Sequence, residues 1–85
     1  MSYAIRFVPR DPWDVSPALY LSTDHTPRLT SMRADVDPFF SQLEARRYVE
    51  ESVCVESLCA RDRLVADAVP LADALADCAD VEVRP

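Results

Sequence analysis

The sequence predicts a small α+β domain, in which an antiparallel sheet of three or four strands packs against two helices. Short runs near the start of the chain alternate apolar and polar residues, which is typical of strands with one buried face. Later runs place apolar residues three and four positions apart, as in a helix with one apolar side. The segments between the early runs are too short for a parallel crossover, so the sheet is expected to be antiparallel.

Three strands are expected in the first part of the chain. Residues 3–8 alternate, are rich in β-forming residues and are followed by Pro9. Residues 18–22 form the second expected strand and residues 28–33 the third. The segment between the second and third strands has the length and the turn-forming residues of a hairpin connection.

The clearest helix signal lies in residues 37–52. Ser41 and Glu44 have the Ser-x-x-Glu spacing of a capping box, in which each side chain bonds the backbone N–H of the other residue. Phe39 and Phe40 precede the cap and are expected to pack back onto the first helical turns. One face of the helix is expected to carry Ala45, Tyr48, Val49, Ser52 and Val53.

A second helix is expected from Leu71 to about residue 79, with Pro70 at its first position. Leu71, Ala74, Leu75 and Cys78 share its apolar face. Residues 53–58 fit either a strand or an extension of the first helix, and residues 64–69 are equally ambiguous. Residues 81–83 alternate and are expected to form a last strand.

Composition limits the possible functions of this chain. The 85 residues, of which 49% are hydrophobic, fit one globular domain spanning residues 1–85. The sequence has no Gly, which excludes the glycine-rich loops that bind phosphates and dinucleotides, so no cofactor is expected. No apolar run approaches the ~20 residues of a membrane span, and the N-terminus lacks a signal-peptide pattern. The expected location is the cytoplasm, with no contact with a membrane.

Enzymatic chemistry has little support in the sequence. Cys54, Cys59 and Cys78 have spacings that match no zinc or redox motif, so we expect buried free thiols and no metal site. His25 is the only histidine, and its polar neighbours in a turn rarely converge on one substrate. No catalytic residue is therefore assigned, although an enzyme that uses His25 or a cysteine is an alternative.

The negative charge of the chain is concentrated in its second part. Residues 1–49 contain six acidic residues and six arginines, whereas residues 50–85 contain nine acidic residues and three arginines, which gives the net charge of −6. This distribution disfavours direct binding to nucleic acid, which needs clustered positive charge. A protein partner with a basic surface is compatible with it.

Two features of the sequence are candidate binding sites. The first is a set of carboxylates in the second part of the chain, namely Asp62, Asp67, Asp73, Asp77, Asp80 and Glu82. Asp73, Asp77 and Asp80 lie on one side of the second helix, where they form either a solvated face or an imitation of a phosphate backbone that occupies a basic groove. The second feature is Trp13, in a proline-containing loop, which is either a lid over the core or an exposed anchor for a partner.

A short, acidic, glycine-free α+β chain with an aspartate-studded helix resembles the small accessory proteins of phages and mobile elements, and among them the anti-CRISPR proteins. This resemblance implies a non-enzymatic inhibitor in the host cytoplasm, which uses its acidic surface to occupy a basic nucleic-acid-binding site on a CRISPR effector or similar complex. The alternative is a structural or homo-oligomeric module that interacts through the sheet face and Trp13.

Overall fold

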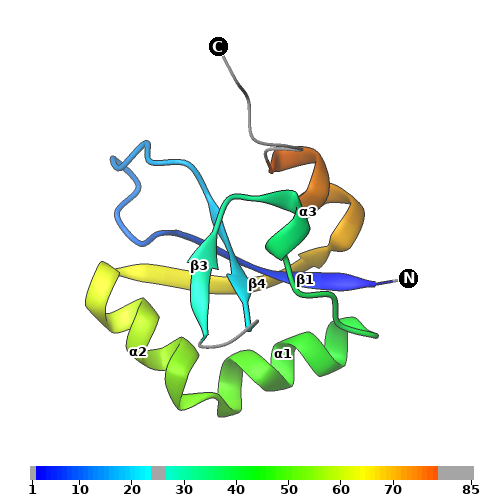
Figure 1. Cartoon of the computed structure of the whole chain (residues 1–85). Coiled ribbons are helices and arrows are strands. Elements are labelled where there is room, and N and C mark those ends of the chain that lie inside the picture. The colour runs from blue at the N-terminus through cyan, green and yellow to red at the C-terminus, as the bar shows by residue number, and fades with distance from the viewer. Residues whose placement is uncertain (1, 24–26, 79–85) are drawn as a thin grey trace.

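The computed structural model describes residues 2–23 and 27–78. These residues form one four-stranded antiparallel sheet with three α-helices and a short 3₁₀ helix, which confirms the expected α+β class and adds one helix (Figure 1). The elements, in chain order, are β1 (Tyr3–Pro9), β2 (Leu19–Ser22), β3 (Arg28–Thr30), η1 (Arg33–Asp35), α1 (Gln42–Glu51), α2 (Val53–Asp62), β4 (Leu64–Pro70) and α3 (Leu71–Asp77).

The strands lie in the order β3-β2-β1-β4. β1 pairs with β4 along its whole length, from Tyr3 opposite Pro70 to Pro9 opposite Leu64. This pairing resolves the ambiguity of residues 64–69, whose own pattern favoured no single structure. The N-terminal strand therefore becomes an inner strand, with partners from opposite ends of the sequence.

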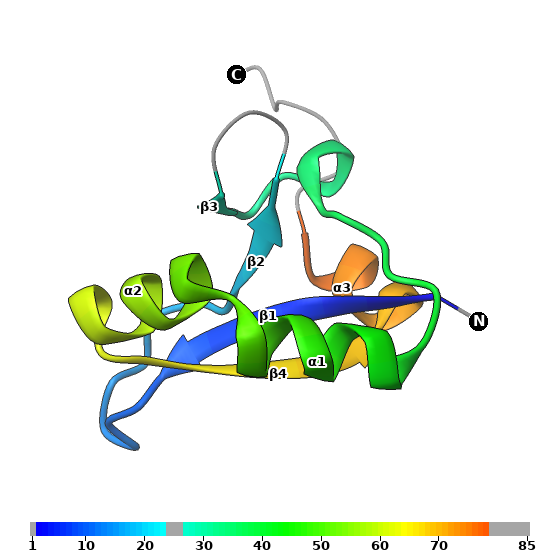
Figure 2. The same cartoon turned by 90° about the horizontal axis from the view of Figure 1, so that it is seen from below.

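One face of the sheet is covered by α1 and α2, which follow one another along it (Figure 2). Their buried residues pack on those of the strands in one cluster, comprising Ile5, Phe7, Leu21, Ala45, Val55, Leu58 and Ala68. These side chains leave water almost completely, which makes this cluster the main apolar contribution to stability.

The other face is partly covered by α3 and by the chain around η1. Ala4, Tyr20, Val36, Val69, Ala74 and Cys78 form a second buried cluster there. Successive residues of a strand point to opposite faces, so Ala4 and Ile5 belong to different clusters. The predicted apolar face of the second helix is confirmed, because Ala74 and Cys78 are buried and Leu71 and Leu75 pack against them.

Residues 37–39, which precede α1, are hydrogen-bonded to the sheet. The N–H of Asp37 donates to the carbonyl of Leu21 on β2 at 3.0 Å, while Phe39 and Tyr3 exchange hydrogen bonds at 2.9 and 2.7 Å. The segment before α1 is therefore bonded to both β1 and β2. These bonds attach the segment that leads into α1 to the sheet.

Serine side chains begin both of the long helices. The N–H of Glu44 donates to Oγ of Ser41 at 3.1 Å, so the predicted start of α1 is confirmed. Ser52 ends α1 in an extended conformation and caps α2, accepting from the N–H of Val55 at 3.3 Å. Residues 53–58 are thus helical, but in a new helix with a different direction. The assignment of Val53 to the buried face of α1 was wrong, since Val53 lies in α2, after the break at Ser52, and is 74% exposed.

Several other expectations need correction. Phe39 packs on the ring of Tyr48, with 5.3 Å between centroids, but Phe40 is exposed and does not pack back on the helix. The third strand ends at Thr30, because η1 follows within a few residues. Pro70 is the N-cap of α3 and the last residue of β4, not the first helical residue. His25 and the strand expected at residues 81–83 lie outside the described residues.

None of the helices in the described part of the chain is both long and apolar enough to cross a bilayer.

Candidate protein-binding surfaces

The structure separates the predicted acidic residues into different environments. Asp62 forms an ion pair with Arg61 at 3.2 Å, and Asp67 forms one with Arg6 at 4.0 Å. A neighbouring guanidinium offsets the charge of each of these two carboxylates. Asp80 and Glu82 lie outside the described residues.

Asp73 and Asp77 remain together on α3. Both are exposed, and they lie four residues apart, on a different side of the helix from the buried Ala74. Oδ2 of Asp77 accepts a hydrogen bond from the hydroxyl of Tyr20 at 2.9 Å. The Tyr20 side chain reaches it from β2 and is only 2% exposed. A buried donor thus holds an exposed carboxylate in a defined position.

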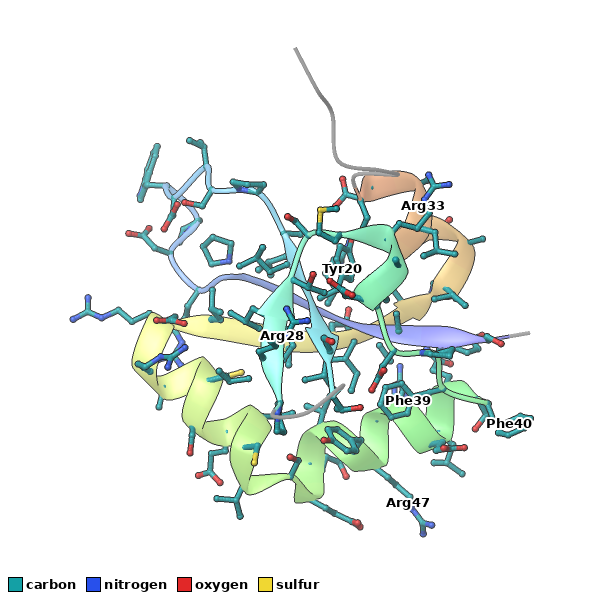
Figure 3. All side chains as sticks on the ribbon, in the orientation of Figure 1. Tyr20, Arg28, Arg33, Phe39, Phe40 and Arg47 are labelled. Carbon is teal, nitrogen blue, oxygen red and sulfur yellow. The ribbon has the colours of Figure 1, made fainter. Side chains whose placement is uncertain are left out.

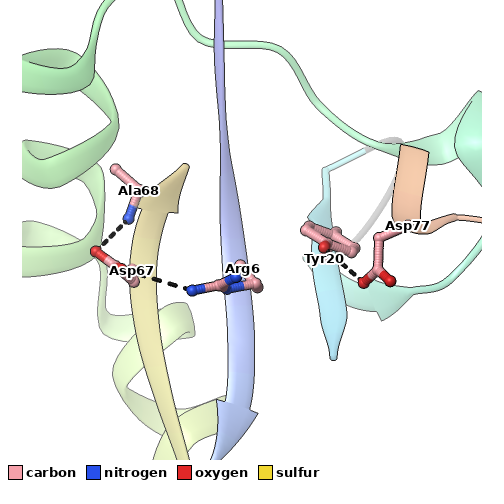
Figure 4. A network of polar contacts seen from close by, with 5 residues as sticks. All are labelled: Arg6, Tyr20, Asp67, Ala68 and Asp77. Atoms are coloured by element: carbon pink, nitrogen blue, oxygen red, sulfur yellow. Dashed lines mark hydrogen bonds and ion pairs between the residues drawn. The ribbon is translucent and has the colours of Figure 1, made fainter. Parts of the chain in front are cut away.

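This contact is part of a polar row across the sheet, made of Asp67, Arg6, Tyr20 and Asp77 (Figure 4). Arg6 lies opposite Tyr20 in the β1–β2 pairing and opposite Asp67 in the β1–β4 pairing. Burial, the hydrogen bond to Asp77 and the negative charge of Asp77 raise the pKa of Tyr20 to about 12, although Arg6 acts in the opposite direction. The hydroxyl therefore stays protonated and keeps donating well above neutral pH.

A second contact holds α3 from η1. Nε of Arg33 donates to the carbonyl of Leu75 in the last turn of α3 at 3.1 Å. A cation at the C-terminal end of a helix also interacts favourably with the helix dipole. Tyr20 on β2 and Arg33 on η1 therefore each donate a hydrogen bond to α3, the helix that carries Asp73 and Asp77.

The structure places Trp13 away from the core. It is 87% exposed, so the interpretation of this residue as a lid over the core is wrong. The loop that carries it is ordered by its own hydrogen bonds. Asp11 accepts from the N–H of Trp13 at 2.9 Å, and Asp14 accepts from the N–H of Ser16 at 2.9 Å. The bonds from Ser16 also lower the pKa of the Asp14 carboxyl.

The chain matches no protein-family model, no curated protein and no solved structure. Its function is therefore inferred from its own surfaces.

The three cysteines differ in environment. Cys78 is buried and Cys59 half-buried, but Cys54 is exposed, so the prediction of buried thiols is correct only in part. Burial raises the pKa of Cys78 and of Cys59, which disfavours the reactive thiolate. Among the described residues, no group of His, Cys, Asp and Glu side chains could hold a metal ion.

Two shallow hollows lie near α1, one along the helix and one before its start. The larger, of about 360 Å³, lies between α1 and β4 and is lined by Arg46, Val49, Glu50, Ala66, Asp67 and Ala68. The smaller, of about 150 Å³, lies before the start of α1 and is lined by Ser2, Pro38, Phe39 and Phe40. Sequence reasoning did not identify the smaller hollow, because the choice of which phenylalanine turns inward depends on the contact between Phe39 and Tyr48.

Proposed function

We propose that this chain is a non-enzymatic, protein-binding inhibitor that places the carboxylates of α3 in a basic nucleic-acid-binding site of a CRISPR effector or similar complex. The main support is the exposed carboxylate of Asp77, which the buried hydroxyl of Tyr20 holds in place. Asp73, one turn earlier on the same helix, supplies a second exposed negative charge. Asp80 and Glu82 continue the acidic sequence after α3.

Fixed charges suit this function better than mobile ones. Immobilising a flexible side chain on binding costs roughly 0.5–1.5 kcal/mol. Asp77 has already lost much of its freedom, so less of that cost falls on the binding step. Tyr20 is a neutral donor, and unlike the arginines beside Asp62 and Asp67 it does not offset the charge of the carboxylate.

The distribution of charge also supports a basic partner. The negative excess lies in residues 50–85, which include α3. Long-range attraction between such a surface and a basic groove accelerates encounter and weakens with salt. Of the six carboxylates that the sequence suggested, Asp62 and Asp67 are paired with arginines. The proposed interaction surface therefore contains fewer carboxylates than the sequence suggested.

The test compares two variants that remove the same charge from different places. Asp73→Asn with Asp77→Asn removes two charges from α3, and Asp62→Asn with Asp67→Asn removes two paired charges elsewhere. Each is added to a panel of purified CRISPR effector complexes, and cleavage of target DNA is measured at low and moderate salt. We expect the wild-type chain and the second variant to inhibit one effector type, and the first variant to inhibit it about tenfold less.

Different failures of this test have different meanings. If the wild-type chain leaves cleavage by every effector unchanged, the inhibitor proposal is wrong. If both variants lose inhibition equally, net charge alone is responsible, and the role of α3 is wrong. Thermal melts of both variants show whether a loss of inhibition reflects a loss of folding.

A second candidate function is supported by Trp13. A large aromatic side chain, 87% exposed on a loop ordered by Asp11 and Asp14, is suited to enter an apolar pocket on another protein. In the alternative function, a structural module interacts through the sheet face and Trp13. Because α1 and α2 cover one face of the sheet and α3 partly covers the other, Trp13 is the accessible part of that interface. Trp13→Ala in the same assay separates the two functions, since it removes the anchor without altering charge.

A further inference from the structure

One edge of the sheet is formed by β4. In the strand order β3-β2-β1-β4, it has a neighbouring strand on one side only. β4 has seven residues, whereas β3 at the opposite edge has three. An edge strand presents N–H and C=O groups with which an extended segment of another protein can pair. Among the described residues, β4 is therefore the strand best suited to accept a further strand.

The hydrogen bonds at the two ends of the β1–β4 pairing show which groups of β4 point outward. The N–H of Leu71 donates to the carbonyl of Ser2 at 2.8 Å, and the N–H of Arg10 donates to the carbonyl of Arg63 at 2.9 Å. Hydrogen-bonded pairs alternate with non-hydrogen-bonded pairs along an antiparallel ladder, so the odd-numbered residues of β4 bond to β1. The outer edge is therefore formed by the N–H and C=O groups of the even-numbered residues Leu64, Ala66 and Ala68.

Two of these outward N–H groups have side chains as partners. The N–H of Ala68 donates to Oδ1 of Asp67 at 2.8 Å, and the N–H of Ala66 approaches the sulfur of Cys59. A thiol is a weak acceptor. Within residues 2–23 and 27–78, no backbone carbonyl accepts from either group. The carboxylate and the thiol thus occupy positions that the carbonyl oxygens of a fifth strand would take.

A hollow lies beside this edge. It has a volume of about 360 Å³, and it lies between residues 66–68 of β4 and one side of α1, formed by Arg46, Val49 and Glu50. The next residue of the helix, Arg47, points away from the domain (Figure 3). The β4 wall has small side chains on this face of the sheet, since Ala68 is buried under the helices and Ala66 packs beside it. Alternate side chains of an added strand would enter this hollow.

We propose that β4 binds an extended segment of a partner protein as a fifth strand, and that this segment places a lysine or arginine opposite Asp67. A carbonyl of the segment replaces Oδ1 of Asp67 as the acceptor for the N–H of Ala68. The released Oδ1 then accepts from the basic side chain across the strands. Asp67 is suited to this exchange because its side chain is 57% exposed and its ion pair with Arg6, at 4.0 Å, uses the other oxygen, Oδ2.

Charge favours such a segment over a second copy of this chain. Asp67 is the middle residue of β4, so a two-fold pairing of two β4 strands about their centre would set one Asp67 carboxylate against the other. Like charges directly opposite each other on paired strands are destabilising, whereas opposite charges are stabilising. The net charge of −6 also attracts a basic segment and repels a second copy. The site uses neither Asp73 nor Asp77, so this proposal and the proposed function can fail separately.

The test uses two synthetic peptides of seven residues, the length of β4. One alternates valine and lysine, and the other alternates valine and glutamate. Each is titrated into the ¹⁵N-labelled chain while the amide resonances are followed by NMR. We expect the lysine peptide to shift the resonances of β4 and of the facing side of α1, with a Kd of about 0.1–1 mM, because a short peptide loses conformational freedom when it pairs. The glutamate peptide should bind about tenfold more weakly.

Three variants test the site itself. Asp67→Lys should reverse the preference, so that the glutamate peptide binds more tightly. Glu56→Lys is the matched control, because it makes the same change in charge at an exposed position on α2, and it should keep the wild-type preference. Ala68→Pro removes an outward N–H without removing a bond to β1, and it should weaken binding of the lysine peptide about tenfold. Circular dichroism establishes that each variant is folded, and Asp67→Asn, which should abolish most of the preference, replaces Asp67→Lys if that variant is not.

Several results would overturn the proposal. One is equal binding of both peptides to the wild-type chain, or shifts that lie away from β4 and α1. Another is a reversed preference in Glu56→Lys, which would make net charge alone responsible. Resonances of β4 that shift with protein concentration when no peptide is present would show that a second copy occupies the edge, and the proposed basic segment would then be wrong.

Discussion

Replacement of Tyr20 by phenylalanine tests the contact on which the presentation of Asp77 depends. The variant removes one hydroxyl, which donates to Asp77 at 2.9 Å, and leaves a ring that is 2% exposed in place. A hydrogen bond to a charged group contributes about 1.5–3 kcal/mol to stability. Asp77 is exposed, so water replaces part of that interaction in the variant. We expect Tyr20→Phe to lower the free energy of unfolding by about 1–2 kcal/mol at pH 7.

The pH dependence gives a sharper test. The pKa of a tyrosine in the unfolded chain is about 10, whereas in the folded chain the pKa of Tyr20 is about 12. Above pH 10 the unfolded state releases this proton more readily than the folded state, so stability falls as pH rises. The contribution is fully present below pH 10 and is lost as pH rises through 12, with a total loss of about 3 kcal/mol.

The assay is chemical denaturation of both proteins at pH 7 and near pH 11. Cys59 and Cys78 also have raised pKa values and lower the stability of both proteins at high pH, so the difference between the proteins reports Tyr20 together with its interactions with Asp77 and Cys78. The stability advantage of the wild-type chain should shrink as pH rises. An advantage that stays constant, or no destabilisation of Tyr20→Phe at pH 7, would refute the proposed role of the hydroxyl.

Two further predictions concern the helices. Ser41→Ala should lower the free energy of unfolding by about 0.5–2 kcal/mol in chemical denaturation, because the N–H of Glu44 loses its acceptor; an unchanged midpoint would mean that this bond contributes nothing. A thiol reagent should label Cys54 rapidly in the folded chain and Cys78 only after unfolding, since the first is exposed and the second is buried. Equal labelling rates in the native state would contradict the packing of α3 on the sheet.

Local pattern in the sequence was sufficient for part of the fold. The alternation of residues 3–8 predicted β1, the Ser41–Glu44 spacing predicted the start of α1, and the apolar spacing after Pro70 predicted the buried face of α3. Each of these features depends on residues within a few positions of one another. The i, i+4 spacing of Asp73 and Asp77 likewise predicted that they lie together on one helix, and they remain the candidate site on α3.

Other features of the candidate surfaces depend on contacts between distant residues. Tyr20 and Asp77 are 57 positions apart, and no signal near either residue indicates their hydrogen bond. The pairing of Asp67 with Arg6 arises only because β4 lies beside β1, and it removes one residue from the predicted acidic surface.

The sequence by itself determined which segments are helical or extended wherever the residues of one turn or one strand carried the signal. The tertiary structure decided which side chains stay exposed. Phe39 and Phe40 are the same residue type in adjacent positions, yet one packs on Tyr48 and the other faces water. Phe39 turns inward where its backbone is bonded to Tyr3 on β1 and its ring contacts Tyr48 on α1. Burial is a property of the assembled sheet and helices, whereas helix caps and strand alternation are properties of neighbouring residues.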